Sequence, residues 1–167
     1  YSADFFMASN NSNGGAIGLD LYTAGFARMA RLLIRADGAV IASAPNTSGV
    51  LSSFVFTNTV TRNSWNSLQI TQVMNSATSS TFSFAVNGFA VTSGTSTVSY
   101  TLNNAAGVTA TDADVQMTNF TVAGAPAVTL SDDYYVDNYR VEAVPEPATM
   151  TALGLGPAAL LRRRQKP

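Results

Sequence analysis

The feature that most constrains the fold of this chain is an alternation of apolar and polar residues, interrupted about every ten residues by turn-forming residues. It is clearest where Phe82, Phe84 and Val86 alternate with small residues and Asn87-Gly88 follows. A period of two places every second side chain on the same face of a strand. Asn-Gly between two such runs is typical of a type I′ turn. This stretch therefore predicts a β-hairpin with one buried face.

The same pattern recurs along most of the chain. Strands are expected at residues 2–9, 16–22, 39–43, 50–60, 68–72, 81–86, 89–91, 97–102, 115–122 and 130–141. Residues 26–35 fit a helical stripe about as well as a strand, but Asp37-Gly38 follows them and favours a hairpin with 39–43. Small polar residues predict a turn at 75–80.

Many short strands with turn residues between them predict an all-β fold, a sandwich of two antiparallel sheets about 10 Å apart. Trp65, Leu68 and Ile70, followed by a polar turn and the 82–88 hairpin, resemble the middle hairpins of concanavalin A-like and laminin-G-like domains. That resemblance implies a jelly roll. No sugar-binding residue of those domains matches a position of this chain.

Composition excludes several classes of protein. Hydrophobic residues make up 46% of the 167 residues, which excludes general disorder, and only 11% are charged. The residues before Pro145 carry five Arg, no Lys and nine acids, a net charge of about −4. Such a body has no basic patch for phosphates, so no nucleic-acid partner is expected.

The end of the chain has a different composition. Pro145-Glu146-Pro147 cannot continue a strand ladder, so the folded domain is expected to stop there. Residues 148–161 are uncharged and rich in Ala, Leu and Gly, and a basic cluster follows them. An apolar segment followed by cations is the layout of a membrane stop signal. The alternative is a disordered basic tail, since the segment includes Pro157 and a spanning helix needs about 20 apolar residues.

This layout resembles the PEP-CTERM sorting signal of Gram-negative bacteria. The residues that carry the resemblance are Pro145, Glu146, Pro147, Arg162, Arg163 and Arg164. The resemblance implies an exported protein that an exosortase processes at the inner membrane, where the tail anchors it transiently. Its destination would be the cell surface or the extracellular polysaccharide.

The chain is thus expected to consist of a β-sandwich domain at 1–143 and a sorting tail at 144–167, either a short apolar helix or disordered. Tyr1 opens a segment that already has the pattern of a strand. We therefore expect a leader and at least one further strand upstream of it.

Catalysis is not expected of this chain. It has no His and no Cys, which excludes the usual triads and thiolate chemistry. The body has one Glu, Glu142, and lacks the pair of carboxylates in a Glu-x-Asp cluster that jelly-roll glucanases use. The alternative is an enzyme whose active residues lie upstream of Tyr1.

Two groups of acids interrupt the neutral surface, Asp112/Asp114 and Asp132/Asp133/Asp137. Ca²⁺ binds six to eight oxygen ligands, and neighbouring carboxylates with loop carbonyls supply them. Asp132, Asp133 and Asp137 are therefore the candidate ligands for calcium, the one cofactor considered. The alternative is that they cap turns and accept backbone hydrogen bonds.

Four aromatic residues are candidates for stacking on sugar rings: Trp65, Tyr134, Tyr135 and Tyr139. The alternative is that they belong to the core, as aromatic residues in alternating strands commonly do. Tyr134 and Tyr135 are adjacent, so one of them must point away from the core.

The sequence as a whole predicts a secreted, surface- or matrix-associated protein that is structural or adhesive and not catalytic. The alternative is a calcium-dependent, lectin-like module that binds extracellular polysaccharide.

Overall fold

The computed structural model describes residues 1–8, 15–25, 27–35, 37–45, 51–56, 60–93, 96–104, 107–119 and 134–143, without the side chains of 45, 51–56 and 119. Every regular element in these ranges is a strand, and they include no helix long and apolar enough to cross a membrane. The predicted sorting tail and two of the predicted calcium ligands, Asp132 and Asp133, lie outside them.

The described chain forms thirteen strands. They are β1 (Ser2–Met7), β2 (Gly15–Tyr22), β3 (Arg28–Arg35), β4 (Val40–Pro45), β5 (Leu51–Phe56), β6 (Trp65–Ser76), β7 (Ser79–Val86), β8 (Phe89–Ala90), β9 (Thr92–Ser93), β10 (Ser96–Thr97), β11 (Ser99–Asn103), β12 (Asp112–Asn119) and β13 (Tyr134–Arg140).

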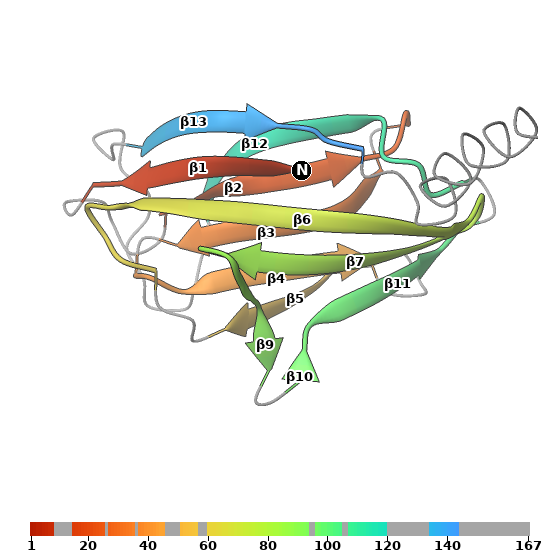
Figure 1. Ribbon diagram of the computed structural model, residues 1–167, viewed down its shortest axis with the longest axis horizontal. Helices are drawn as coiled ribbons and strands as arrows, with labels where there is room; N and C mark the ends of the chain where they lie inside the picture. Colours follow the sequence, from red (N-terminus) through yellow and green to blue (C-terminus); the bar gives the residue numbers. More distant parts are fainter. Residues whose placement is uncertain are drawn as a thin grey trace, which may run out of the picture.

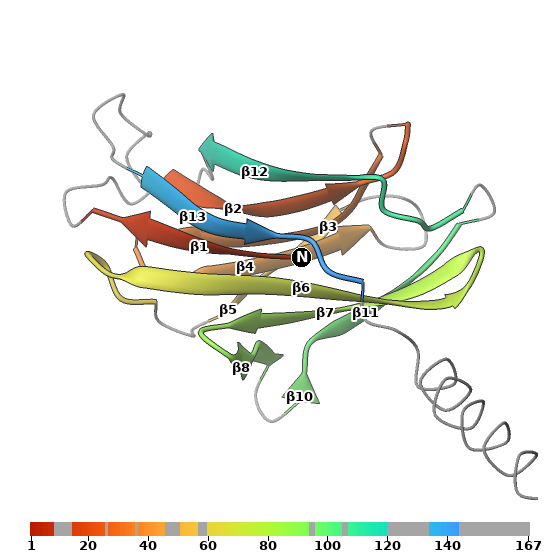
Figure 2. The same ribbon diagram turned by 45° about the horizontal axis from the view of Figure 1, so that its top comes forward.

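Two antiparallel sheets form the body. Sheet A has the order β11-β7-β6-β1-β13, with β8 beside β7, and sheet B has the order β12-β2-β3-β4-β5. Figures 1 and 2 show the sheets as two layers, with the edge strands β13 and β12 on the same side of the molecule. The predicted two-sheet antiparallel sandwich is confirmed.

The core lies between the sheets, and alternation places its side chains there. β7 alternates strictly between half-buried and buried residues. The larger core residues are Phe5, Met7, Leu68, Ile70, Phe82 and Phe84 from sheet A, and Ile17, Leu19, Leu21, Leu32, Ile34 and Val40 from sheet B. Burying one such side chain contributes about 1.5–3 kcal/mol, so this layer holds the sheets together.

The hairpin predicted at Asn87-Gly88 is confirmed. Val86 pairs with Phe89, and both intervening residues have positive φ, 52° at Asn87 and 79° at Gly88. Two positive φ angles are the signature of a type I′ turn, whose twist matches that of the flanking strands.

The hairpin at Asp37-Gly38 is also confirmed, and the helical alternative is wrong for residues 28–35, which form β3. The N–H of Arg35 donates to the Ala39 carbonyl at 2.8 Å, and Gly38 has φ 89°. The connection therefore spans the three residues between Arg35 and Ala39, and the glycine takes the left-handed position common in three-residue loops.

The turn predicted at residues 75–80 is shorter than expected. Ser76 pairs with Ser79, so only Ala77 and Thr78 connect β6 to β7. Ser79 and Ser80 also pair with Asn103 and Leu102 of β11. Pairing on both sides outweighs the weak strand preference of serine, because strand propensity depends strongly on context.

Strands β2 and β3 are buried on both faces. The outer face of sheet B, which is turned away from sheet A, includes a second apolar cluster of Ala16, Leu33 and Ile41, each without exposed surface. Asp20 on this face is also fully buried. The charged groups of this face therefore need partners within the protein.

Candidate functional site

Three aromatic side chains form a row across the outer face of sheet A. Phe6 of β1 lies opposite Trp65 of β6 on one side and opposite Tyr135 of β13 on the other. The Phe6 ring centroid is 5.6 Å from that of Trp65 and 5.8 Å from that of Tyr135, with the rings tilted by 58° and 65°. We call Phe6, Trp65 and Tyr135 the aromatic row.

The outer rings of this row are open to solvent. Trp65 is 49% exposed and Tyr135 is 55% exposed, while Phe6 between them is half-buried. Successive residues of a strand point to opposite faces, so Phe5 fills the core and Phe6 faces outward. Tyr134 likewise packs against the core while its neighbour Tyr135 faces out, as predicted.

A polar row runs beside the aromatic row, two residues away from it on each strand. Asp4 of β1 lies opposite Asp137 of β13 and opposite Ser67 of β6. Asn138, which has φ 51°, donates from its side-chain amide to Asp4 Oδ2 and from its backbone N–H to Asp137 Oδ1, both at 2.7 Å. Asp4, Ser67 and Asp137 are the polar row below.

Of the three predicted calcium ligands, the structure describes only Asp137. Its neighbour across the strand pair is Asp4. Among the described residues, no three acidic side chains lie close enough together to hold a metal ion. The calcium site at Asp132, Asp133 and Asp137 stays a prediction.

The four aromatic candidates from the sequence do not lie together. Trp65 and Tyr135 join the same row, Tyr134 turns inward, and Tyr139 donates from its hydroxyl to the Ala113 carbonyl of β12. Burial, with the nearby Asp114 and Asp112, raises the pKa of the Tyr139 hydroxyl. Tyr139 thus bridges the edges of the two sheets.

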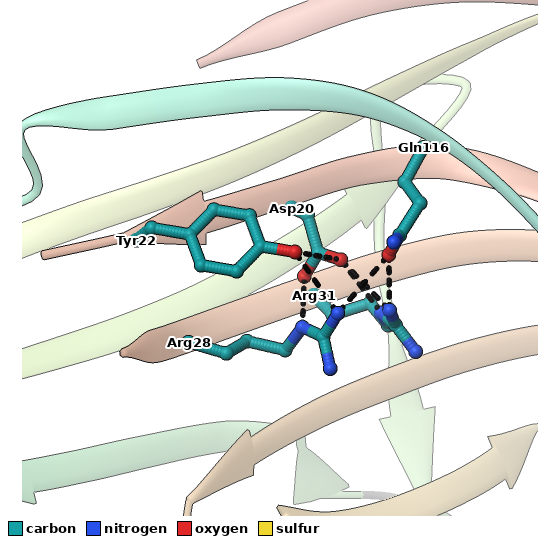
Figure 3. Close-up of polar contacts among 5 residues, drawn as sticks. All are labelled: Asp20, Tyr22, Arg28, Arg31 and Gln116. Atoms are coloured by element: carbon teal, nitrogen blue, oxygen red, sulfur yellow. Dashed lines mark hydrogen bonds and ion pairs between the residues drawn. The ribbon is translucent and has the colours of Figure 1, made fainter. Parts of the chain in front are cut away.

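A buried charged cluster, which the sequence did not reveal, lies on the outer face of sheet B (Figure 3). Its members are Asp20, Tyr22, Arg28, Arg31 and Gln116. Asp20 Oδ1 accepts from Arg28 Nε at 2.8 Å. Asp20 Oδ2 accepts from the Tyr22 hydroxyl at 3.0 Å and from Arg31 Nε and Nη2 at 3.0 and 2.8 Å.

Gln116 connects this cluster to the edge strand β12. Its Oε1 accepts from Arg28 Nη2 at 3.1 Å and from Arg31 Nη2. Burial alone would lower the pKa of Arg28, but its hydrogen bonds to Asp20 and Tyr22 outweigh this and raise it. The hydrogen bonds of the cluster tie β12, β2 and β3 together. Because Asp20 has no exposed surface, the cluster does not offer an open site.

The comparisons with solved structures return proteins of low identity. A galectin from Caenorhabditis elegans, LEC-6, gives a TM-score of 0.45 at 17% identity, covering 82% of this chain and 80% of that one. A tetrameric galectin from the ball sponge Cinachyrella sp. gives a TM-score of 0.45 at 13% identity, covering 82% of this chain and 86% of that one. An alginate lyase from Alteromonas sp. 272 gives a TM-score of 0.38 at 12% identity, covering 83% of this chain and 71% of that one.

None of the curated proteins has a sequence that matches this chain. One family model does match, that of the PEP-CTERM protein-sorting motif, over residues 143–165. This motif implies an exported cell-surface protein of a Gram-negative bacterium and processing by an exosortase, a membrane protease. The chain therefore carries a PEP-CTERM sorting motif directly behind a two-sheet β-sandwich.

Proposed function

We propose that this chain is a non-catalytic structural or adhesive protein of the bacterial surface or its extracellular polysaccharide. The observation that carries the proposal is the position of the sorting motif. The match begins at residue 143, three residues after β13 ends at Arg140. Residues 144–167 then form the sorting tail behind the β-sandwich domain, and the apolar segment anchors the protein in the inner membrane until processing.

The residue content of the body supports a role without catalysis. With no His and no Cys in the chain, acid–base chemistry would fall to carboxylates. Asp20 and Asp37 are held in ion pairs, and Asp137 lies on an exposed strand. A carboxylic acid that must donate a proton near neutral pH is usually held in an apolar pocket.

Cell fractionation in an exosortase-containing Gram-negative host tests this function. The variant lacking residues 144–167 should lose its place at the cell surface. Glu146→Ala probes the motif alone, and Glu142→Gln, just outside the match, is the matched control that should sort normally. An unchanged distribution of the truncated protein would contradict the proposal, as would release of new reducing ends from host polysaccharide by the purified protein.

A second candidate is a calcium-dependent, lectin-like module. The aromatic row beside the polar row favours carbohydrate binding, because sites for such ligands combine apolar side chains with a few placed polar groups. Binding to extracted extracellular polysaccharide, with and without EDTA, tests this candidate. Binding that survives EDTA would contradict the calcium dependence, and no binding at all would contradict the lectin-like function.

A further inference from the structure

The aromatic row stands out against its surroundings on sheet A. Elsewhere on this outer face, the exposed or half-buried positions of β6, β7 and β11 carry small or neutral polar side chains, apart from Val73 of β6, which is 54% exposed. These positions include Gln69, Thr71, Ser79, Thr81, Ser83, Ser99 and Thr101. Two half-exposed rings toward the β13 edge of such a surface form a local apolar site on a largely hydrophilic face.

From this arrangement we propose that the outer face of β13, β1 and β6 binds a neutral polysaccharide chain. The aromatic row stacks on the C–H faces of the sugar rings, and the polar row accepts hydrogen bonds from their hydroxyls. The inference rests on the carbohydrate binding of the second candidate function, without its calcium dependence, and adds to it the location of the site and the charge of the ligand.

The aromatic row and the polar row together match the amphipathic character of a sugar. A pyranose ring has an apolar face of C–H groups and a rim of hydroxyls. Aromatic rings offer large contact areas at a small loss of side-chain entropy. The register places Asp4 and Asp137 two residues from Phe6 and Tyr135 on the same face, so polar acceptors border the rings.

The two carboxylates of the polar row are held in place by hydrogen bonds that occupy only one oxygen of each. Asn138 donates to Oδ2 of Asp4 and to Oδ1 of Asp137, and no hydrogen bond to another described residue occupies Asp4 Oδ1 or Asp137 Oδ2. Carboxylate oxygens form stronger hydrogen bonds with hydroxyls than neutral acceptors do. A preorganised pair of this kind lowers the entropy cost of binding.

The negative charges beside the aromatic row favour a neutral polysaccharide over an acidic one. Two carboxylates border the rings, and the described cation nearest along β13, Arg140, is ion-paired with Glu142 at 3.1 Å. An acidic polysaccharide would bring its carboxylates toward Asp4 and Asp137, and like charges at short range oppose binding.

Stabilisation of the sheet alone does not account for the exposure of these rings. Cross-strand aromatic pairs stabilise sheets, but Trp65 and Tyr135 leave about half of their surface to solvent. Phe6, the least exposed of the three, contacts both neighbours and fixes their spacing. Phe6 is therefore a positioning residue, and Trp65 and Tyr135 provide the contact area.

Affinity electrophoresis of the full chain tests the proposal, with a neutral β-glucan and a neutral galactan as probes and alginate as the acidic comparison. Trp65→Ala and Tyr135→Ala should each weaken binding to the neutral polysaccharide about tenfold, and Trp65→Phe should restore most of it. Asp4→Asn should weaken it several-fold. The matched control is Phe89→Ala, which removes a 76% exposed ring from β8 outside the patch and should leave binding unchanged.

The thermal unfolding midpoint of each variant separates lost contact from lost folding, and Trp65→Ala should remain folded at the assay temperature. The proposal would be overturned if neither neutral polysaccharide bound. It would also be overturned if Trp65→Ala and Phe89→Ala weakened binding equally, or if alginate bound more tightly than the neutral polysaccharides. Loss of binding in EDTA would overturn the assignment to a metal-free polar row. Polysaccharide binding that is unchanged in Trp65→Ala and Tyr135→Ala would overturn this site alone, whereas absence of binding to every polysaccharide tested would overturn the lectin-like function as well.

Discussion

Asp20 on β2 lies directly opposite Arg31 on β3, and Arg31 donates two hydrogen bonds to the same carboxylate oxygen, at 3.0 and 2.8 Å. The Asp20 carboxylate also accepts from Arg28 and Tyr22 (Figure 3). Removing one partner from a buried charge network leaves the others desolvated and unpaired. The stability of β2 and β3 should therefore depend strongly on this single acid.

We expect Asp20→Asn to lower the free energy of unfolding by about 3–5 kcal/mol, because two guanidinium groups lose their shared counter-ion. Urea denaturation measures the loss. The control is Glu142→Gln, whose ion pair with Arg140 is exposed and should contribute no more than about 1 kcal/mol. Equal effects of the two substitutions would contradict a structural role for the cluster.

Gly18 is expected to tolerate no side chain. A Cβ placed there would lie 2.1 Å from the Leu32 carbonyl oxygen and 2.8 Å from the Leu33 Cα, both backbone atoms. Gly18→Ala must displace β3 and should cost about 1–3 kcal/mol or more. At Gly25 the nearest atom is the Thr23 hydroxyl at 3.9 Å, so Gly25→Ala should change the unfolding midpoint little. A Gly18→Ala variant as stable as Gly25→Ala would contradict this packing.

Gly88 should be sensitive for a different reason. Nothing lies within 4 Å of a Cβ at this position, but its φ is +79°, which L-residues other than Gly rarely adopt. Gly88→Ala should cost about 1–2 kcal/mol through backbone strain alone. Gly88→Asn should cost less, because asparagine tolerates the left-handed region better. Thermal denaturation of the two variants checks this order, and the reverse order would contradict the type I′ turn.

Asp37 should make part of the stability depend on pH. The hydrogen bond from Arg35 holds the pKa of the Asp37 carboxyl below its ordinary value, despite some burial. A lowered folded-state pKa gives stability that is present above the unfolded-state value of about 3.9 and lost as pH falls through the folded-state value. The difference in unfolding midpoint between the wild type and Asp37→Asn should be constant near pH 6 and shrink below about pH 4. A gap that grows on acidification would contradict this.

The sandwich was predictable because its signal is local. Alternation along β7 and the turn residues Asn87-Gly88 and Asp37-Gly38 specify hairpins within a few residues. The sequence also predicted that Tyr134 and Tyr135 point in opposite directions, because this follows from the pleat alone.

The candidate sites were less predictable because they depend on which strands become neighbours. Phe6, Trp65 and Tyr135 meet only because β1 lies between β6 and β13, an order that no local pattern encodes. Alternation places Asp20 on the face away from the core, but it does not indicate that this face is also buried. The pairing of Asp20 with Arg31 therefore emerged only from the structure.

Processing at the sorting motif is tested by the intact mass of the protein recovered from the surface of an exosortase-containing Gram-negative host. We expect a shortened chain that keeps the β-sandwich and has lost the Arg162–Arg164 cluster, with the uncut chain accumulating in the inner membrane when the exosortase is removed. Surface protein that retains the whole of residues 143–165, in the same amount with or without the exosortase, would contradict it.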